Sequence, residues 1–147
     1  MPSTFDPLLR LELQATGENA TTWGIKTNNN LDLIAAAVAG IATVSVSAGD
    51  TTLTTANALP DQARCAILLV EGTLTANANI IVPASPKTYI FVRNTSGAFN
   101  ITVKQGAGSG TVLPATGPAL IVNTSVTTLD LMAGLLNNYG IRITETF

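Results

Sequence analysis

The side chains that most often carry out chemistry in proteins are nearly missing from this sequence. It contains no histidine and a single cysteine, Cys65. Histidine is the commonest general base and zinc ligand near neutral pH, and one cysteine can form neither a cysteine cluster nor an internal disulfide bond. Cys65 begins the apolar run 65–70, where a free thiol ordinarily packs as a small hydrophobic side chain. We therefore expect no catalytic residue and no metal or cofactor site, and we expect that the protein is not an enzyme.

The carboxylates and the glycines do not form a recognisable site either. All acidic residues lie more than five positions apart, so no helical or strand spacing forces two carboxylates together, as catalysis by a carboxylate pair requires. Gly106, Gly108 and Gly110 superficially resemble a phosphate-binding loop, but the strand-to-helix context of such a loop is missing. We predict a hairpin loop at these glycines.

Charge is unusually scarce. Charged residues make up 11% of the chain, against roughly 25% in an average soluble domain. The seven basic residues are scattered, so no basic patch can follow a phosphate backbone, and nucleic-acid binding is disfavoured. The longest apolar run, 34–42, is far shorter than the ~20 residues that cross a bilayer, and the first residues lack the pattern of a signal peptide. We expect no membrane segment and synthesis in the cytoplasm.

The stretch 72–104 organises the rest of the chain. Phe99, Ile101 and Val103 alternate with polar residues, which is the period of a half-buried strand. Residues 89–92 are apolar on both sides, as in a central strand covered on both faces. Residues 94–98 between them tolerate turn geometry, so we predict a β-hairpin.

Residues 1 to about 26 have the character of an extended arm. Two prolines interrupt its start, and Leu9, Leu11 and Leu13 then alternate with charged or polar residues. We expect such an arm to need a partner surface. The only tryptophan, Trp23, ends a loop-like segment and is interpreted as a packing anchor, with a binding-site role as the alternative.

A short α-helix is predicted after the arm. Thr27 and the three asparagines that follow it can satisfy the free amides of a first turn, and Gly40 stands where the helix can end. Leu31, Ile34 and Val38 follow at helical spacing, and alanines give the helix slim sides. We favour docking of this helix on the β core of the same chain; a three-fold cluster of symmetry-related helices is the alternative.

From residue 41 onward the pattern is that of strands. About eight or nine short alternating or apolar segments, the last at 139–144, are separated by turn residues. This spacing predicts a mainly β fold, a β-sandwich or jelly-roll-like domain. We therefore divide the chain into an extended N-terminal arm with one short α-helix, residues 1–40, for attachment to a subunit or particle, and a β-sandwich domain, residues 41–147.

Several stretches resemble a known family. The segments GENATTWG at 17–24 and TNNNLDLI at 27–34 are similar to the opening phrase of a group of tailed-bacteriophage virion proteins. The β module that follows in those proteins is similar to GTLTAN at 72–77, Val82-Pro83, Tyr89 and NTSG at 94–97. Together the resemblance covers roughly residues 17 to 104.

The resemblance implies a structural protein of the phage particle, generally trimeric. It is either a capsid cement or decoration protein, or the particle-proximal module of a tail fibre or spike. A fibre would continue into a long shaft, and this sequence does not, which favours a small protein on the capsid lattice. A charge-poor, apolar-rich chain also exposes apolar surface unless other copies cover it. An arm laid across a neighbouring subunit would do so.

We thus expect a homotrimer on the virion surface, made in the host cytoplasm, whose partner is the major capsid protein or another virion protein. A tail fibre or spike anchor or adaptor module and a carbohydrate-binding module are the alternatives. The side chains expected to contact a subunit or the particle are Phe5, Leu9, Leu11, Leu13, Trp23, Leu31, Ile34 and Val38.

Overall fold

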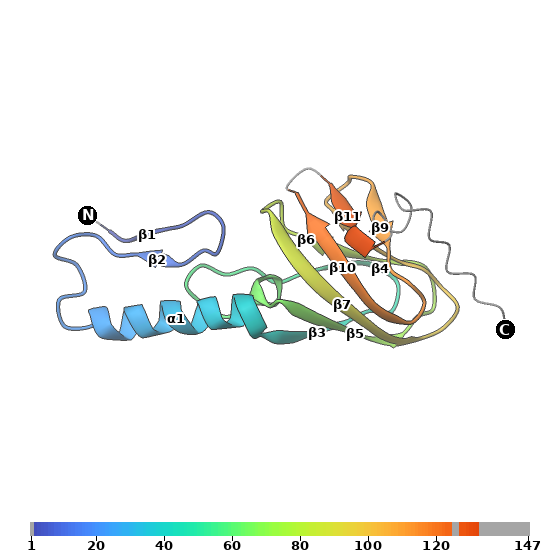
Figure 1. Cartoon of the computed structure of the whole chain (residues 1–147), viewed down its shortest axis with the longest axis horizontal. Helices are drawn as coiled ribbons and strands as arrows, with labels where there is room; N and C mark the ends of the chain where they lie inside the picture. The colour runs from blue at the N-terminus through green and yellow to red at the C-terminus, as the bar shows by residue number, and fades with distance from the viewer. Residues whose placement is uncertain (1, 125–126, 133–147) are drawn as a thin grey trace.

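The described part of the chain is mainly β-structure with one α-helix, as predicted (Figure 1). The structure is a computed structural model that describes residues 2–124 and 127–132. The predicted strand at 139–144 lies outside these residues. The elements in chain order are β1 Thr4–Phe5, β2 Glu12–Leu13, α1 Trp23–Ala39, β3 Ile41–Ser45, β4 Gly49–Thr52, the 3-10 helix η1 Gln62–Arg64, β5 Ile67–Thr73, β6 Ala78–Val82, β7 Lys87–Ser96, β8 Ile101–Gln105, β9 Gly110–Val112, β10 Gly117–Asn123 and β11 Thr128–Asp130.

Strands β1 and β2 form a small sheet of their own, and strands β3 to β8 alternate between two larger sheets. The first sheet has the order β11-β10-β7-β5-β3 and the second the order β4-β6-β8-β9. The neighbours β3, β5 and β7 run parallel in the first sheet, and β4, β6 and β8 run parallel in the second. We call the pairs β3–β4, β5–β6 and β7–β8 rungs, because each stacks on the next. This parallel stacking differs from the antiparallel strands of a jelly roll.

The predicted hairpin between residues 89 and 103 is therefore wrong. Strands β7 and β8 lie in different sheets, and residues 97–100 connect one sheet to the other. The turn residues misled the prediction, because a hairpin turn and this connection use the same kind of residue. Gly97 has a φ of 94° and packs against the carbonyl of Leu74, which a residue with a side chain could not do. The hairpin predicted at Gly106, Gly108 and Gly110 is confirmed, because β8 and β9 pair antiparallel around that loop.

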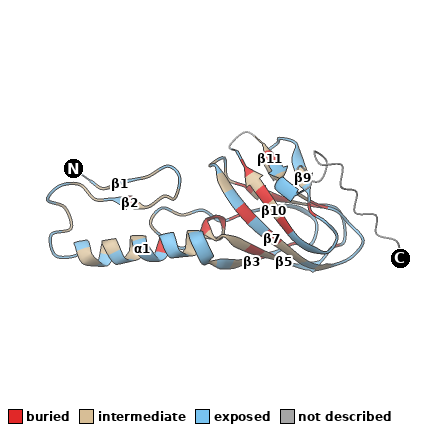
Figure 2. Ribbon diagram, viewed as in Figure 1, coloured by how far each residue is buried: buried red, intermediate tan, exposed pale blue. Residues whose placement is uncertain are grey.

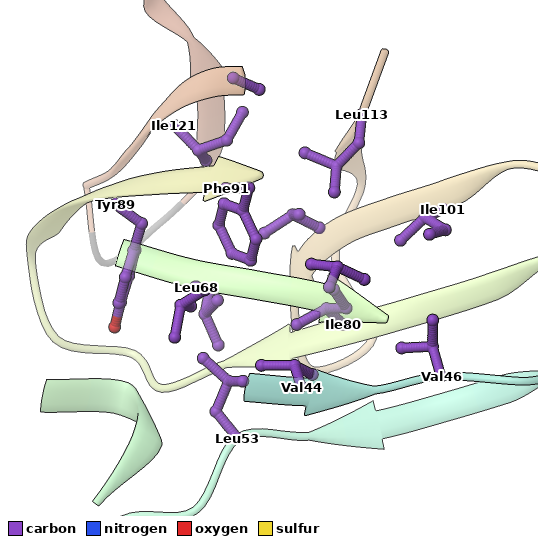
Figure 3. Packing of buried hydrophobic residues seen from close by; sticks show 14 of the residues in the cluster. Val44, Val46, Leu53, Leu68, Ile80, Tyr89, Phe91, Ile101, Leu113 and Ile121 are labelled. Atoms are coloured by element: carbon purple, nitrogen blue, oxygen red, sulfur yellow. The ribbon is translucent and has the colours of Figure 1, made fainter. Parts of the chain in front are cut away.

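One hydrophobic cluster fills the space between the two larger sheets (Figure 3). Strand β7 is central in its sheet, and its Tyr89 and Phe91 point into the cluster. Ile101 and Val103 are buried from the other sheet, as their alternation predicted. The expectation that residues 89–92 are covered on both faces is wrong, since Ile90 is exposed. One face of each sheet thus supplies the core.

A loop closes the open edge of the first rung. The side chain of Gln62 donates to the carbonyl of Thr43 in β3 and accepts from the amide of Thr54, just after β4. Leu53 is buried under the loop. A covered sheet edge resists pairing with other chains. The loop therefore covers part of the outer edge of the first rung, where α1 joins β3.

Helix α1 extends away from the two sheets, and the arm of residues 2–22 lies along it (Figure 1). Docking of the helix on the β core, which the sequence favoured, is therefore wrong. The one buried residue of α1 is Leu33. One turn earlier, the Asn29 side chain donates to the carbonyl of Ala58 in the loop before η1, and Asn30 binds Glu12 of the arm. The helix ends before Gly40 as predicted, but it begins at Trp23, four residues before the predicted start. Asn30 binds the arm and caps no helix end.

Candidate functional site

The arm is fastened to helix α1 by polar contacts at Glu12. The Glu12 amide donates to the Asn30 side chain at 3.1 Å, and that side chain donates back to the Glu12 carbonyl at 2.8 Å. The Glu12 carboxylate lies 2.9 Å from the Lys26 ammonium. The hydrogen bond from Lys26 is the main cause that lowers the pKa of Glu12. The arm therefore keeps its negative charge while folded onto the helix.

The two sides of the arm differ in burial. The sequence placed Leu9, Leu11 and Leu13 on one side as contacts for a subunit or the particle; in the structure Leu13 is 51% exposed, and Glu12 is buried. Leu9 and Leu11 are half-buried. The partners of Glu12 on α1 offset the free-energy cost of burying its carboxylate, because a buried charge needs a partner of opposite sign.

The arm is fastened to the β body by a second cluster, Arg10, Asp61 and Arg64, which we call the Asp61 cluster. One guanidinium nitrogen of Arg10 donates to both oxygens of Asp61, at 3.0 and 2.9 Å. Arg64 donates to the same carboxylate at 3.2 Å. The amides of Ala56 and Arg64 donate to it as well. A backbone bond from Ala58 to the carbonyl of Arg10 closes the junction.

Arg64 is a buried charge whose hydrogen bonding is incomplete. Its side chain is fully buried, and its Nε and Nη1 have no hydrogen-bond partner among the described residues. Burial lowers the pKa of Arg64, although the charge of Asp61 opposes this. Its remaining nitrogen also donates to the carbonyls of Ala56 and Leu59. The cluster holds chain segments together and leaves no exposed charge to receive a ligand.

Three neighbours of this cluster have shifted pKa values. Lys87 donates to the carbonyl of Arg64, and burial lowers the pKa of Lys87 to about 8. Burial also raises the pKa of the Cys65 thiol. Because the thiolate is the reactive form of cysteine, this shift makes Cys65 a poor nucleophile at neutral pH. Tyr89, whose pKa is raised by burial, donates to the carbonyl of Ala63.

The exposed apolar side chains of the N-terminal half form the candidate interaction surface (Figure 2). Six of the eight side chains predicted as contacts are exposed: Phe5, Leu13, Trp23, Leu31, Ile34 and Val38. Trp23 is 61% exposed, so its interpretation as a packing anchor within this chain is wrong. Its place in the first turn of a projecting helix, which the sequence did not predict, explains the exposure.

These residues divide into two surfaces. Phe5, Leu8 and Leu13 of the arm form what we call the arm surface. Leu31, Ile34 and Val38 form what we call the helix stripe, whose side chains lie about 100° to 160° round α1 from Leu33. Leu8 was missed because it sits beside a proline outside the alternating pattern. Exposed Ile25 and Ile41, at the two ends of the helix, were also missed as contacts.

A carbohydrate-binding module would need exposed aromatic side chains as a platform. Trp23 is exposed, Tyr89 is buried in the core, and Tyr139 lies outside the described residues. Within the described ranges, no group of three or more histidine, cysteine, aspartate or glutamate side chains is placed to hold a metal ion. No helix in that part of the chain is both long and apolar enough to cross a bilayer.

Comparison with known proteins gives no relative: no protein-family model, no curated protein and no solved structure matches this chain.

Proposed function

We propose that this protein is a structural protein of a tailed-bacteriophage virion, a trimeric capsid cement or decoration protein that binds and stabilises the capsid shell. The observation that carries the proposal is the arm–helix unit, which projects from the β body and exposes apolar side chains along its length. Monomeric proteins rarely expose large apolar patches, so such a surface favours a binding role. The proposed function is binding itself, with no catalytic step.

The way in which the arm is held supports attachment through a pre-formed surface. Glu12 and Arg10 fix the arm to α1 and to the β body, so Phe5, Leu8 and Leu13 need little ordering when they bind. Pre-organised groups lose less conformational entropy on binding and gain affinity. On a symmetric shell, modest contacts of this kind repeat with every copy.

The β body has a different part in this proposal. We take the two larger sheets to act as a β-sandwich that shares the single hydrophobic cluster described above. The cluster draws on both sheets and on none of the arm residues. The body can therefore stay folded when the arm surface is altered, which allows attachment and stability to be tested separately.

The test compares two substitutions of equal exposure. Leu13 on the arm surface and Val112 on β9 are both 51% exposed. We expect Leu13→Ser to reduce incorporation into purified phage particles at least tenfold, because the lost apolar contact weakens binding at every site. We expect Val112→Ser to leave incorporation unchanged. Equal incorporation of both variants would refute attachment through the arm surface.

A tail fibre or spike anchor is the second candidate. It is favoured by the elongated arm–helix unit, which fits a narrow socket as well as a shell (Figure 1). The number of copies per particle separates the two functions, since a tail anchor occurs in few copies and a shell protein occurs at every lattice position.

A further inference from the structure

The five-stranded sheet has a second apolar face, opposite the face that supplies the core. Leu68, Phe91 and Ile121 belong to the cluster between the two larger sheets, so the residues that alternate with them along β5, β7 and β10 point outward. A sheet that meets water on one side normally carries polar residues there. In this sheet the outward side chains are mostly apolar, which is the composition of a covered surface.

The outward side chains lie in rows across the sheet, because the strands pair in register. The central row crosses four strands and consists of Ile41, Ile67, Ile90 and Leu120. The rows on either side of it consist of Thr43, Leu69, Val92 and Pro118, and of Thr88, Val122 and Leu129. We call these three rows the outer face.

The described residues leave the outer face open to solvent. Ile41 is 59% exposed, Ile90 38% and Leu129 52%, and the other apolar members are half-buried or exposed. None of the three rows contains a charged side chain; Glu71 lies one row beyond Leu69. A contiguous apolar surface of this kind marks a site that other apolar groups cover.

We propose that residues 133–147 of this chain bind the outer face and cover it. The described part of the chain ends at Met132, two residues after β11, and β11 is an edge strand of the same sheet. The segment AGLLNNYGIRITETF therefore starts beside the surface that it is proposed to cover. The inference goes beyond the proposed function and does not depend on attachment to a particle.

The length and composition of this segment fit the outer face. Five strands spaced about 4.8 Å apart span roughly 19 Å, and a fully extended segment of this length reaches about 50 Å, so it can cross the sheet from β11 to β3. Tyr139, Ile141 and Ile143 recur at every second position. Arg142 falls between them, so in an extended segment the apolar side chains can meet the sheet while Arg142 stays in water.

The covalent connection favours this segment over a separate molecule. A group joined to its site by a short linker is present there at an effective concentration in the millimolar range. A second copy of the chain reaches such a concentration only in very concentrated solution. Binding of the segment also removes apolar surface from water on both sides of the contact. The outer face is then closed to other partners, while the arm surface stays accessible.

The first experiment measures trypsin cleavage after Arg142 in the full chain. Ile90→Asp places a charge at the centre of the outer face, and we expect it to speed this cleavage at least tenfold, because the protease reaches a segment only when it is released. The matched control is Val112→Asp, which places the same charge at a 51% exposed position on β9 of the other sheet. The control should be cleaved at the rate of the unchanged chain.

Intact mass spectrometry follows the loss of residues 143–147, and circular dichroism checks that both variants keep their fold. Equal cleavage rates for Ile90→Asp and Val112→Asp would overturn the inference. If Ile90→Asp also lowers incorporation into particles while the rates stay equal, a particle protein covers the outer face instead of residues 133–147.

The second experiment tests contact directly and needs no charge in the sheet. In a Cys65→Ala background, a short thiol crosslinker should join Ile90→Cys to Ile141→Cys within one chain, as peptide mapping of the monomer band would show. The control pair, Val112→Cys with Ile141→Cys, should crosslink far less. Equal crosslinking of the two pairs would refute the contact, and crosslinks only between different chains would assign the outer face to a second copy.

The outcomes are separate from those of the proposed function. Attachment to the particle is measured by incorporation of Leu13→Ser, which lies on the arm surface and outside the three rows. Cover of the outer face is measured by cleavage and crosslinking of the purified chain, without any particle. Either proposal can therefore fail while the other stands.

Discussion

At the scale of single residues, Asp61 joins three parts of the chain. It receives hydrogen bonds from Arg10 of the arm, from Arg64 of η1 and from the amide of Ala56. No sequence pattern predicted this cluster, because Arg10 and Asp61 are separated by 51 positions and charge pairing at that distance has no local pattern. The composition showed only that charges are few. A buried charge is held by a partner, but composition does not say which charges are buried or which residues they pair with.

Breaking the two ion pairs of the Asp61 cluster should lower the free energy of unfolding by different amounts. Asp61→Asn leaves Arg64 charged and buried without an anion, and we expect a loss of about 3–5 kcal/mol in the free energy of unfolding. Arg10→Met leaves the Asp61–Arg64 pair in place, and we expect a loss of about 1–2 kcal/mol. Urea denaturation of both variants measures the difference. Equal losses would show that Asp61 does not neutralise Arg64.

Lys87 should give the protein a pH dependence in the basic range. Its pKa is lowered from 10.5 to about 8 by burial. Between these values the unfolded chain binds one proton more than the folded chain at this site, so the contribution of Lys87 to stability rises with pH. We expect the stability of the unchanged chain relative to Lys87→Met to increase by about 1–2 kcal/mol from pH 8 to pH 10, because solvent screens part of the effect on this partly exposed side chain.

Chemical denaturation at fixed pH values measures this difference, and the comparison with Lys87→Met removes the contributions of Cys65 and Tyr89. A relative stability that falls over the same range would contradict the burial of Lys87.

At the scale of elements, hydrophobic periodicity predicted the type of several segments but not their neighbours. Ile101 and Val103 are buried as their alternation required. The pattern could not tell whether β8 pairs with β7 or crosses to a second sheet, because both connections use turn residues. Gly97, between β7 and β8, shows the constraint on this connection: a Cβ there would lie 2.4 Å from the carbonyl oxygen of Leu74. Such close approach between successive rungs has no signature in composition.

The helix was predicted, but its surroundings were not. The apolar spacing of Leu31, Ile34 and Val38 was interpreted as the side that docks on the β core, and the structure leaves that side exposed. Leu33 carries the packing instead, against the arm. An amphipathic pattern marks a side that is to be covered, and it does not state whether the cover belongs to the same chain.

Leu33→Ala should loosen the arm while sparing the β body. Removing a buried leucine side chain costs about 2–5 kcal/mol, but Leu33 is not part of the core cluster between the sheets. We expect amide hydrogen exchange to accelerate in residues 2–22 and α1, with protection in β5 and β7 unchanged. A uniform loss of protection would show that the arm–helix unit and the β body unfold together.

At the scale of the whole molecule, the division predicted near residue 40 coincides with the end of α1 and the start of β3 (Figure 1). The arm nevertheless has partners within its own chain, so it does not need a neighbouring subunit to hold it. Exposed apolar side chains lie on the arm surface, along the helix stripe and also on the β body, as at Val112 and Leu129. The proposed function assigns the arm surface to the particle.

The central claim is that the chain occupies the capsid lattice of a phage particle. Quantitative mass spectrometry of purified particles tests it most directly, by the ratio of this chain to the major capsid protein. The proposal predicts a fixed ratio, set by the lattice symmetry and unchanged after washing away loosely bound proteins. A ratio corresponding to only a few copies per particle would place the chain in the tail, and its absence from washed particles would contradict the account.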